Sequence, residues 1–373
     1  MEDITSKSMD ALVTPAAIVD LVRMDANITR MSEYAQGSGV ALRPHTKTHK
    51  SARLARLQLA AGAHGVTVAT VREAEVMAAV ADDILLAYPP IGAAKLDRLF
   101  ALPRHVNLGV ALDSPEALET LAAAARASDR TVGVLVEVDL GMRRVGLGSA
   151  TDVVRLARIA AATEGIDYRG VLFYPGHIRE DVAEQGPALE RLARDMERLL
   201  EALSTSEVPA RTVSGGSTPT AFGTHILPGI TEIRPGTYIF NDRTTAAIGA
   251  CAWDDCAYSV LATVVSTAVA GQAVIDAGAK ALAREELRGA TGDGYGALLD
   301  RPEVVVRALS EEHGILDLSA TRWRPRIGDR VQVVPNHVCV SVNLHDRVFA
   351  ARGSEIVDWW PVDARGWQSS LPT

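Results

Sequence analysis

Residues 43–50 (RPHTKTHK) concentrate side chains that can do covalent and acid–base chemistry. The segment holds Arg43, His45, Lys47, His49 and Lys50. A lysine amine can form a Schiff base with an aldehyde, and neighbouring cations and burial favour its neutral, nucleophilic form. Histidine titrates in the range that general acid–base catalysis requires. The alternative interpretation is a solvated basic loop, because lysine-rich turns are common and need no function.

Two other segments have the composition of phosphate-binding turns. Residues 214–220 read SGGSTPT and residues 234–238 read RPGTY. Backbone amides at turns and helix N-termini bind phosphate, and the loops after strands seven and eight of a β/α barrel often hold a phosphate group. A glycine-rich turn can also be purely structural, so the position of these segments in the fold decides between the two interpretations.

A third candidate pair is His337 and Cys339 in PNHVC. If this segment is extended, residues two apart project from the same face of a strand. An imidazole and a thiolate together suit zinc, and with only two protein ligands the remaining positions are left for water and a substrate hydroxyl. The alternative is one core thiol beside one surface histidine.

The elements that must position these residues follow a β/α rhythm from residue 22 to about 240. Eight strand-like runs alternate with helical stretches such as SPEALETLAAAARAS, which keep one apolar stripe. The runs cover 41–45, 65–70, 83–88, 106–112, 132–138, 170–174, 212–216 and 232–236. Eight such units predict a closed α/β barrel of the (β/α)8 TIM type, with the active site at the carboxyl ends of its strands.

After Asn241 the chain consists mainly of β-branched runs separated by turns. This sequence pattern predicts a mostly β C-terminal domain. The early run AIVDL is strand-like and is expected to pair with it. The predicted domains are therefore a barrel at 22–245 and a β-rich domain made of 1–21 and 246–373, which carries the candidate metal ligands.

Composition narrows the possible partners. The 373 residues are 47% hydrophobic and 23% charged, with a formal net charge of -8, which gives no general electrostatic reason to bind nucleic acid or an anionic membrane. No apolar run approaches the roughly 18 residues that span a bilayer. The net charge therefore favours a small-molecule partner. Three cysteines and the absence of a signal-peptide layout predict a cytoplasmic protein.

The segments RPHTKTHK, LVEVDLGMRRVGLG, GGSTPT, EIRPGTY and PNHVC, in this order, resemble the D-threonine aldolase and D-serine dehydratase family of fold-type III pyridoxal-phosphate enzymes. The likeness covers nearly the whole chain. It implies that Lys47 holds pyridoxal 5'-phosphate and that Arg144, rather than Arg143, lies near the pyridine ring. Tyr174 matches an active-site tyrosine, whereas the Pro-Gly-His that follows it departs from the aldolase pattern at His177.

The resemblance also implies how the phosphate and a divalent metal are bound. The expected phosphate-binding residues are Gly216, Ser217, Thr218, Gly236, Thr237 and Tyr238. The expected ligands of zinc, manganese or magnesium are His337 and Cys339. Glu312, His313, His345 and Asp346 are weaker candidates for the surroundings of the metal, and Cys251 and Cys256 are expected to be ordinary thiols.

The activity that the resemblance favours is cleavage of a β-hydroxy D-amino acid to glycine and an aldehyde, with His49 or His45 as the base. The alternative is a dehydratase of D-serine or 3-hydroxy-D-aspartate that yields a keto acid and ammonia, with Lys47 removing the α-proton. His-x-Cys is typical of the dehydratases, whereas the VNLHD that follows is closer to the aldolases. An amino-acid racemase and a non-catalytic cofactor carrier remain further alternatives, and family members of this fold imply a homodimer.

Overall fold

The computed structural model describes residues 7–288 and 294–366, and these form two compact units. One unit is a barrel made of residues 31–178 and 183–236. The other is β-rich and contains, of the described residues, 7–30, 179–182, 237–288 and 294–365. Residues 22–30 and 237–245 thus pack with the β-rich unit.

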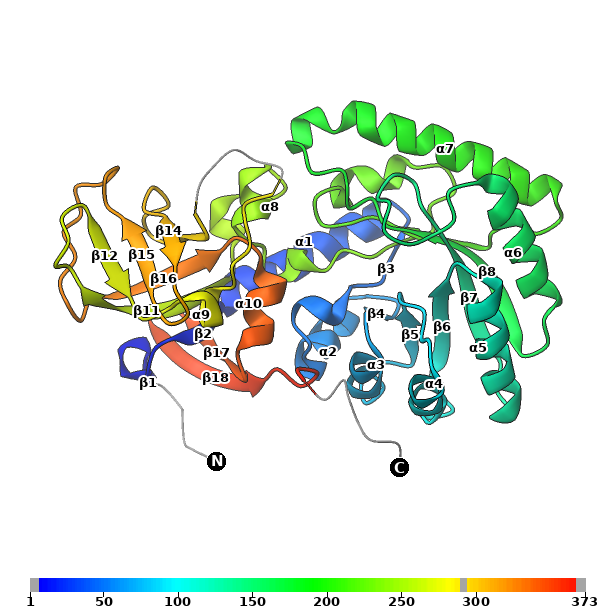
Figure 1. Ribbon diagram of the computed structural model, residues 1–373, viewed down its shortest axis with the longest axis horizontal. Helices are drawn as coiled ribbons and strands as arrows, with labels where there is room; N and C mark the ends of the chain where they lie inside the picture. Colours follow the sequence, from blue (N-terminus) through cyan, green and yellow to red (C-terminus); the bar gives the residue numbers. More distant parts are fainter. Residues whose placement is uncertain (1–6, 289–293, 367–373) are drawn as a thin grey trace. The chain divides into compact units, whose positions relative to one another are not determined.

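Eight parallel strands form the sheet of the barrel (Figure 1). They are β3 (Ala41–Leu42), β4 (Val66–Val68), β5 (Asp83–Leu86), β6 (Asn107–Leu112), β7 (Val132–Val138), β8 (Ile166–Phe173), β9 (Thr212–Gly215) and β10 (Glu232–Ile233). Their order is β3-β10-β9-β8-β7-β6-β5-β4, and a parallel bridge between His45 and Thr67 joins the two ends of this order. The predicted TIM-type α/β barrel is confirmed.

Helices follow the strands and pack on the outside of the sheet (Figure 1). They are α2 (Ala52–Ala60), α3 (Val71–Met77), α4 (Ala93–Phe100), α5 (Pro115–Ala127), α6 (Ala150–Ala162) and α7 (Gly186–Thr205). In α5, the Ser114 side chain accepts from the Ala117 N–H and proline stands in the first turn, as expected of a helix start. Leu118, Leu121 and Ala125 form its buried face and join the core cluster of the barrel.

Short 3-10 helices and one further helix complete the connections. They are η1 (Met9–Ala11), η2 (Thr46–Thr48), η3 (Val182–Glu184), η4 (Ala221–Ile226), η5 (Thr237–Ile239), η6 (Trp253–Asp255) and α1 (Leu21–Gly37). Within the described residues, none of these or the other helices is long and apolar enough to cross a membrane.

The second unit is built on a ten-stranded, largely antiparallel sheet. Its strands are β1 (Lys7–Ser8), β2 (Ala16–Asp20), β11 (Tyr258–Ser266), β12 (Gln272–Ile275), β13 (Gly296–Leu298), β14 (Val306–Leu309), β15 (Gly314–Asp317), β16 (Arg330–Pro335), β17 (Arg347–Arg352) and β18 (Glu355–Pro361). Its helices are α8 (Arg243–Ala247), α9 (Ala279–Leu282) and α10 (Val338–Leu344). Strand β2 pairs antiparallel with β11 and parallel with β17, so the expected pairing of AIVDL with this domain is confirmed.

Candidate active site

Three predicted cofactor residues meet at the carboxyl ends of the barrel strands. Lys47 lies in η2, just after β3, and its Nζ is 5.7 Å from the centroid of the Tyr174 ring. Arg144 follows β7, and its Cζ is 5.1 Å from the same centroid. Tyr174 directly follows β8. Two cations from separate loops therefore contact one aromatic ring, each at a distance typical of a cation–π contact.

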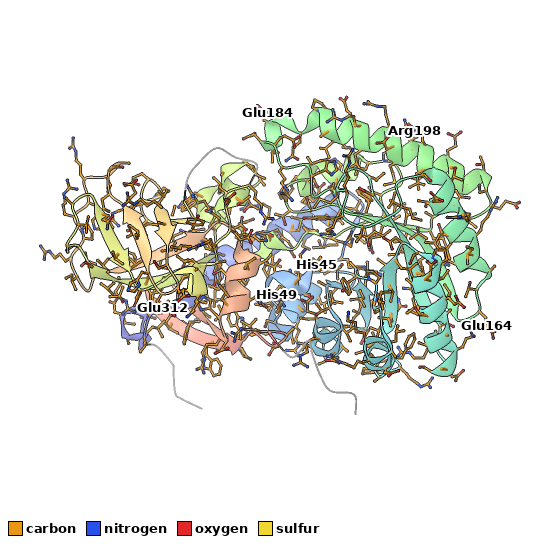
Figure 2. All side chains as sticks on the ribbon, in the orientation of Figure 1. His45, His49, Glu164, Glu184, Arg198 and Glu312 are labelled. Carbon is orange, nitrogen blue, oxygen red and sulfur yellow. The ribbon has the colours of Figure 1, made fainter. Side chains whose placement is uncertain are left out.

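His45 is the N-cap of η2 (Figure 2), and the charges of Lys47 and Arg144 act on its ring, so it belongs to the same cluster. Burial lowers the pKa of His45 well below its ordinary value, and the nearby charges of Lys47, Arg234 and Arg144 lower it further. The ring is therefore neutral at physiological pH. Its Nδ1 is buried and, within the part of the chain that the structure describes, has no hydrogen-bond partner. A buried ring nitrogen without a partner is available to a ligand.

Arg234 and Glu137 also reach this cluster, although the sequence did not single them out for it. Arg234 is 5% exposed, and its Nη2 donates to the Phe173 carbonyl at 2.8 Å, while its Nε is buried without a partner among the described residues. Burial raises the pKa of Glu137, and the charges of Arg234 and Arg144 oppose that rise. The signal in the sequence was a charge inside the apolar run VGVLVEV, because a buried carboxylate needs a cation nearby.

His49 is held differently from His45. Its Nδ1 accepts from the Ser51 backbone N–H at 3.1 Å, and its Nε2 lies 3.1 Å from Gln58 Oε1. Nε2 must therefore carry the proton and donate to Gln58. Burial lowers the pKa of His49 to about 4, against the opposing effects of Gln58 and Ser51. Both ring nitrogens are engaged in local structure, so the geometry favours His45 over His49 as an acid–base group.

Two more basic residues of the 43–50 segment serve the fold. Arg43 binds Glu232 through Nε at 2.8 Å and also pairs with Asp83, both at the amino ends of barrel strands, so its side chain points away from the mouth where the sequence placed it. Side chains alternate along a strand, so Arg43 points to the same side as Ala41, into the amino-terminal end of the barrel interior. Lys50 forms a buried ion pair with Glu73 at 3.4 Å.

The predicted phosphate loops are narrow and buried. Gly216 has φ +85°, a conformation that favours glycine, and Ser217 and Thr218 are 5% and 6% exposed. A Cβ at Gly236 would lie 2.8 Å from Thr48 Oγ1 and 2.9 Å from the His45 carbonyl oxygen, so this position leaves room only for glycine. Thr237 and Tyr238 begin η5 directly afterwards.

These features fit pyridoxal phosphate. The barrel offers a lysine amine beside an aromatic ring, unpartnered buried nitrogens on His45 and Arg234, and a glycine cradle next to the lysine segment. The residues that would hold the cofactor are Lys47, Arg144 and Tyr174, together with the two glycine turns.

The candidate metal ligands lie in the β-rich unit, and their local structure differs from the expected strand. Strand β16 ends at Pro335, His337 is the N-cap of α10, and Cys339 lies in its first turn. The helix begins here because the Val338 N–H donates to Asp242 Oδ2 at 3.1 Å. The expectation that His337 and Cys339 share one face of a strand is therefore wrong.

Two side chains of the 237–242 segment contact this pair. Thr237 Oγ1 is 3.8 Å from Cys339 Sγ, and Asp242 Oδ2 is 3.1 Å from His337 Nδ1. Burial alone would lower the pKa of His337, but Cys339 and Asp242 together raise it well above its ordinary value. No group of three or more His, Cys, Asp and Glu side chains suited to a metal occurs among the described residues. A cation bound by His337 and Cys339 would take its other ligands from water or substrate.

The weaker candidates have ordinary surroundings. Glu312 pairs with Lys280 at 2.7 Å on the exposed surface, and His345 Nε2 lies 3.0 Å from the Ala281 carbonyl oxygen. His177 is exposed and lies against Gly141, where a Cβ would be 2.8 Å from its Nε2. Cys251 Sγ contacts Thr245 Oγ1 at 3.6 Å.

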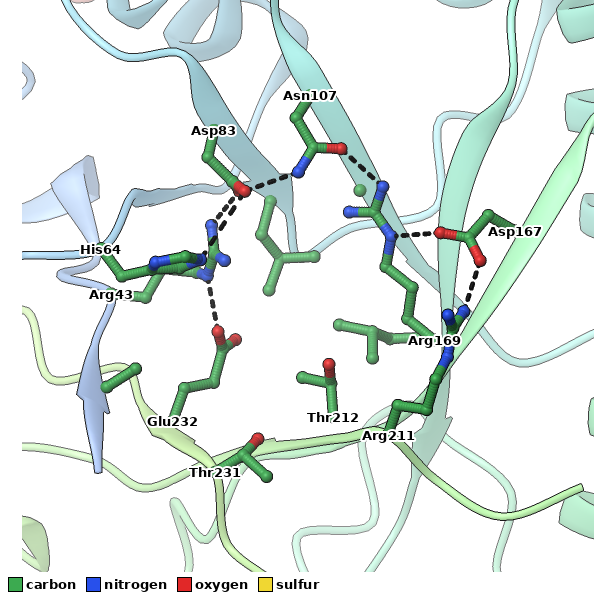
Figure 3. A pocket seen from close by; sticks show the side chains of 14 residues that line it. Arg43, His64, Asp83, Asn107, Asp167, Arg169, Arg211, Thr212, Thr231 and Glu232 are labelled. Atoms are coloured by element: carbon green, nitrogen blue, oxygen red, sulfur yellow. Dashed lines mark hydrogen bonds and ion pairs between the residues drawn. The ribbon is translucent and has the colours of Figure 1, made fainter. Parts of the chain in front are cut away.

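A polar cavity of about 430 Å³ occupies the amino ends of the barrel strands (Figure 3). Its charges are paired with one another: Arg43 with Asp83 and Glu232, and Arg169 with Asp167 at 2.9 Å. Asn107 links the two groups through bonds to Asp83 and Arg169. A network that satisfies its own charges stabilises the floor of the barrel, and residues at this face of such barrels serve stability.

Comparisons with known proteins show which family the chain resembles. Residues 19–244 match the family "Alanine racemase, N-terminal domain", and residues 257–351 match a serine dehydratase domain. The chain is 39% identical over 352 residues to the D-threo-3-hydroxyaspartate dehydratase of Delftia sp. (strain HT23), covering 88% of this chain and 92% of that protein. It is 32% identical over 364 residues to the D-threonine aldolase of Arthrobacter sp., covering 95% of this chain and 93% of that protein.

Two solved structures of a D-threo-3-hydroxyaspartate dehydratase have the same fold. A histidine-to-alanine mutant gives a TM-score of 0.87 at 33% identity and covers 97% of both chains. A cysteine-to-alanine mutant in the metal-free form gives 0.85 at 33% identity and covers 97% of this chain and 100% of that one. The two mutated positions are two residues apart in that protein. With its alanine-racemase-like barrel, its serine dehydratase domain and relatives that are lyases over most of its length, the chain belongs to the D-threonine aldolase and D-serine dehydratase family of pyridoxal-phosphate-dependent enzymes.

Proposed function

We propose that the protein is a pyridoxal-phosphate- and divalent-metal-dependent dehydratase of β-hydroxy D-amino acids. The pair His337 and Cys339 carries this proposal. It has the residue types and the spacing of the two positions mutated in the dehydratase structures, one of which is metal-free. The 39% identity to the Delftia dehydratase, against 32% to the Arthrobacter aldolase, supports the same choice.

The barrel supplies the covalent and proton-transfer groups. Pyridoxal phosphate supplies an aldehyde that captures the substrate amine and a ring that accepts electron density from the α-carbon. Lys47 would hold the cofactor through Nζ. Because Nζ lies 5.7 Å from the centroid of the Tyr174 ring, at the carboxyl end of the barrel, we assign removal of the α-proton to it. Tyr174 and Arg144 limit where this amine can move.

The β-rich unit supplies the group that assists departure of the hydroxyl. A divalent cation acts as a Lewis acid and makes a coordinated oxygen a better leaving group. His337 and Cys339 would hold this cation in place. In the net reaction the substrate would lose water: its α-proton would pass to Lys47 Nζ and hydroxide would leave the β-carbon. The resulting enamine, freed from the cofactor when Lys47 takes its place again, would tautomerise to an imine, and one water would hydrolyse that imine to a keto acid and ammonia.

An aldolase is the second candidate, and a specific observation favours it. The chain is similar to the Arthrobacter D-threonine aldolase over 95% of its length, and VNLHD follows the metal pair. This reaction needs a base for the hydroxyl proton. His45 fits that role because its Nδ1 is buried without a partner within the described chain, whereas both nitrogens of His49 are engaged.

The test is a product assay on the cofactor-loaded protein. D-threo-3-hydroxyaspartate, D-serine and D-threonine are each incubated with zinc, manganese or magnesium and, separately, with EDTA. Keto acid and ammonia, lost in EDTA, support the dehydratase. Glycine with an aldehyde supports the aldolase and overturns the first choice. Neither product overturns both lyase activities. A separate incubation with D-alanine that yields L-alanine then indicates a racemase, and no turnover of any substrate indicates a cofactor carrier.

A matched pair of lysine variants makes this test specific. Lys47→Ala removes the amine beside Tyr174 and should abolish turnover. Lys95→Ala removes an equivalent contact elsewhere in the barrel, where Lys95 Nζ lies 5.3 Å from the centroid of the Tyr88 ring. Activity of the Lys95 variant should equal that of the wild type. Full activity of Lys47→Ala would rule out the proposed chemistry.

The proposed setting is a homodimer in the cytoplasm. No disulfide joins Cys251, Cys256 or Cys339, all of which lie in the described residues, and this agrees with a reducing compartment. The dimer rests on the family likeness and is measured by light scattering of the purified protein at several concentrations.

A further inference from the structure

Both candidate metal ligands are held by one short segment of the chain. Thr237, at the start of η5, contacts Cys339 Sγ through its hydroxyl at 3.8 Å. Asp242, at the other end of the segment, contacts His337 Nδ1 through Oδ2 at 3.1 Å. All four residues belong to the β-rich unit. The chain therefore has a built support behind the ligand pair, contributed from about a hundred residues earlier in the sequence.

Asp242 is the better defined of the two supports. Its side chain is fully buried, and both of its oxygens act as acceptors. Oδ1 accepts from the Thr245 N–H and hydroxyl, each at 2.9 Å. Oδ2 accepts from the Val338 N–H at 3.1 Å. Because Oδ2 already acts as an acceptor, the shared proton at His337 lies on Nδ1, and in the neutral ring the lone pair is then on Nε2.

The neighbouring residues fix the position of this carboxylate. Thr245 Oγ1 accepts from the Asp242 N–H at 2.8 Å and completes a capping box at the start of α8. Asn336 Oδ1 accepts from Arg243 at 3.1 Å, and Asn336 Nδ2 donates to the Glu285 and Gly294 carbonyls. The segments around 242 and 336 are thus joined by several bonds, and Asp242 has little freedom to move away from His337.

We propose that Asp242 is the positioning residue of the metal centre: it holds His337 in the Nδ1–H tautomer and orients Nε2 toward the cation. The Thr237 hydroxyl, 3.8 Å from Cys339 Sγ, limits where that sulfur can move. This inference rests on the proposed metal centre. Outer groups of this kind fix the tautomer and ring orientation of a histidine ligand, and losing one typically costs about 10- to 100-fold in metal affinity.

A purely structural role for Asp242 makes a different prediction. If Asp242 only caps α8 and α10, a variant that weakens the α8 cap should affect metal binding as much as a change at Asp242 itself. Thr245→Ala is that matched control: it removes the capping-box hydroxyl, while the Thr245 N–H at 2.9 Å and the Val338 N–H at 3.1 Å still hold the Asp242 carboxylate with Oδ2 opposite His337. Asp242→Asn keeps the shape of the side chain but removes the charge and one acceptor.

The experiment measures zinc affinity by competition with a chromophoric chelator. Wild type, Asp242→Asn, Thr245→Ala, His337→Ala and Cys339→Ala are compared, all loaded with cofactor. We expect a fall of about 10- to 100-fold in Asp242→Asn and less than about 3-fold in Thr245→Ala. In the cobalt-substituted proteins, the thiolate-to-cobalt absorption should persist in Thr245→Ala and weaken in Asp242→Asn at equal total cobalt.

A second measurement keeps the inference testable if Asp242→Asn does not fold. Nitrogen-15 NMR of histidine rings in the wild-type protein, with the His337 signal assigned by its loss in His337→Gln, reports the tautomer directly. Zinc on Nε2 with the proton on Nδ1 supports the inference, and zinc on Nδ1 overturns it. Zinc affinity equal in Asp242→Asn and wild type, but lost in His337→Ala, refutes the inference alone. Zinc binding absent in wild type, or unchanged in both ligand variants, refutes the metal centre as well.

Discussion

At the scale of the residue, His45 and His49 lie four positions apart and have opposite surroundings. His45 keeps a buried Nδ1 without a partner in the described chain, whereas His49 uses Nδ1 to accept from Ser51 and Nε2 to donate to Gln58. The sequence could nominate both histidines because both follow the same strand. It could not separate them, because the separation depends on Gln58 in the next helix and on a turn at Ser51.

His49 should make stability depend on pH. Its folded-state pKa is about 4 because of burial, and in the unfolded chain it is near 6.5. Between these values the unfolded state binds more protons, so stability is fully present above about pH 6.5 and falls as the pH drops towards about 4. The loss in the free energy of unfolding across this window is of the order of 3 kcal/mol. When the free energy of unfolding is measured by urea denaturation at several pH values between about 4 and 6.5, it should vary less with pH in His49→Asn than in the wild type.

His105 provides the control for this measurement. Its side chain is 60% exposed and lies 3.6 Å from the exposed carboxylate of Asp82. His105→Asn should therefore leave the pH profile of the wild type unchanged. A His49→Asn profile as steep as that of His105→Asn would show that other groups cause the pH dependence.

Gly236 gives a second prediction at this scale. In Gly236→Ala the new methyl would lie 2.8 Å from Thr48 Oγ1 and 2.9 Å from the His45 carbonyl, so the Lys47 segment must shift. Overpacking of this kind costs about 1–3 kcal/mol. We expect affinity for pyridoxal phosphate, measured by fluorescence titration, to fall by roughly 5- to 100-fold. Gly148→Ala, whose Cβ would meet nothing within 4 Å, should bind the cofactor like the wild type.

At the scale of the element, the β/α rhythm was predictable because amphipathic helices and apolar strands have different periods. The eight predicted runs coincide with β3 to β10. The helix at residues 338–344 (VCVSVNL) could not be predicted from the sequence, because alternating valines favour a strand. Here Asp242 caps the backbone at Val338, and Val338, Ser341 and Val342 are buried at helical spacing. A contact from a distant segment overrides the local preference and moves Cys339 off the face that the sequence assigned to it.

The floor of the barrel depends on the charge of Arg43. Arg43→Leu would leave Glu232, which is 5% exposed in its side chain, without its cation, and breaking a buried pair costs about 3–5 kcal/mol. We expect a matching loss in the free energy of unfolding, measured in urea, with part of it restored by adding Glu232→Gln. Arg155→Leu breaks an exposed pair with Asp152 at 3.0 Å and should cost less than about 1 kcal/mol. Equal losses in the two single variants would contradict the role of the floor network.

At the scale of the whole molecule, the residues that we propose for the two halves of the chemistry belong to two compact units. The predicted cofactor residues Lys47, Arg144 and Tyr174 belong to the barrel, and both candidate metal ligands belong to the β-rich unit. The proposed dehydration needs the cofactor for the α-carbon and the cation for the β-hydroxyl. Binding of one group should then be separable from binding of the other, although turnover requires both.

Variants at Lys47 and Cys339 test this division. Lys47→Ala should lose the pyridoxyl label that borohydride reduction leaves on Lys47, detected by mass spectrometry, while zinc affinity changes by less than about 3-fold, because no metal ligand is altered. Cys339→Ala should keep the label and lose most zinc binding, since one of two protein ligands is gone. Loss of zinc binding in Lys47→Ala would mean that the cation depends on the cofactor site, and the two roles could no longer be assigned to separate units.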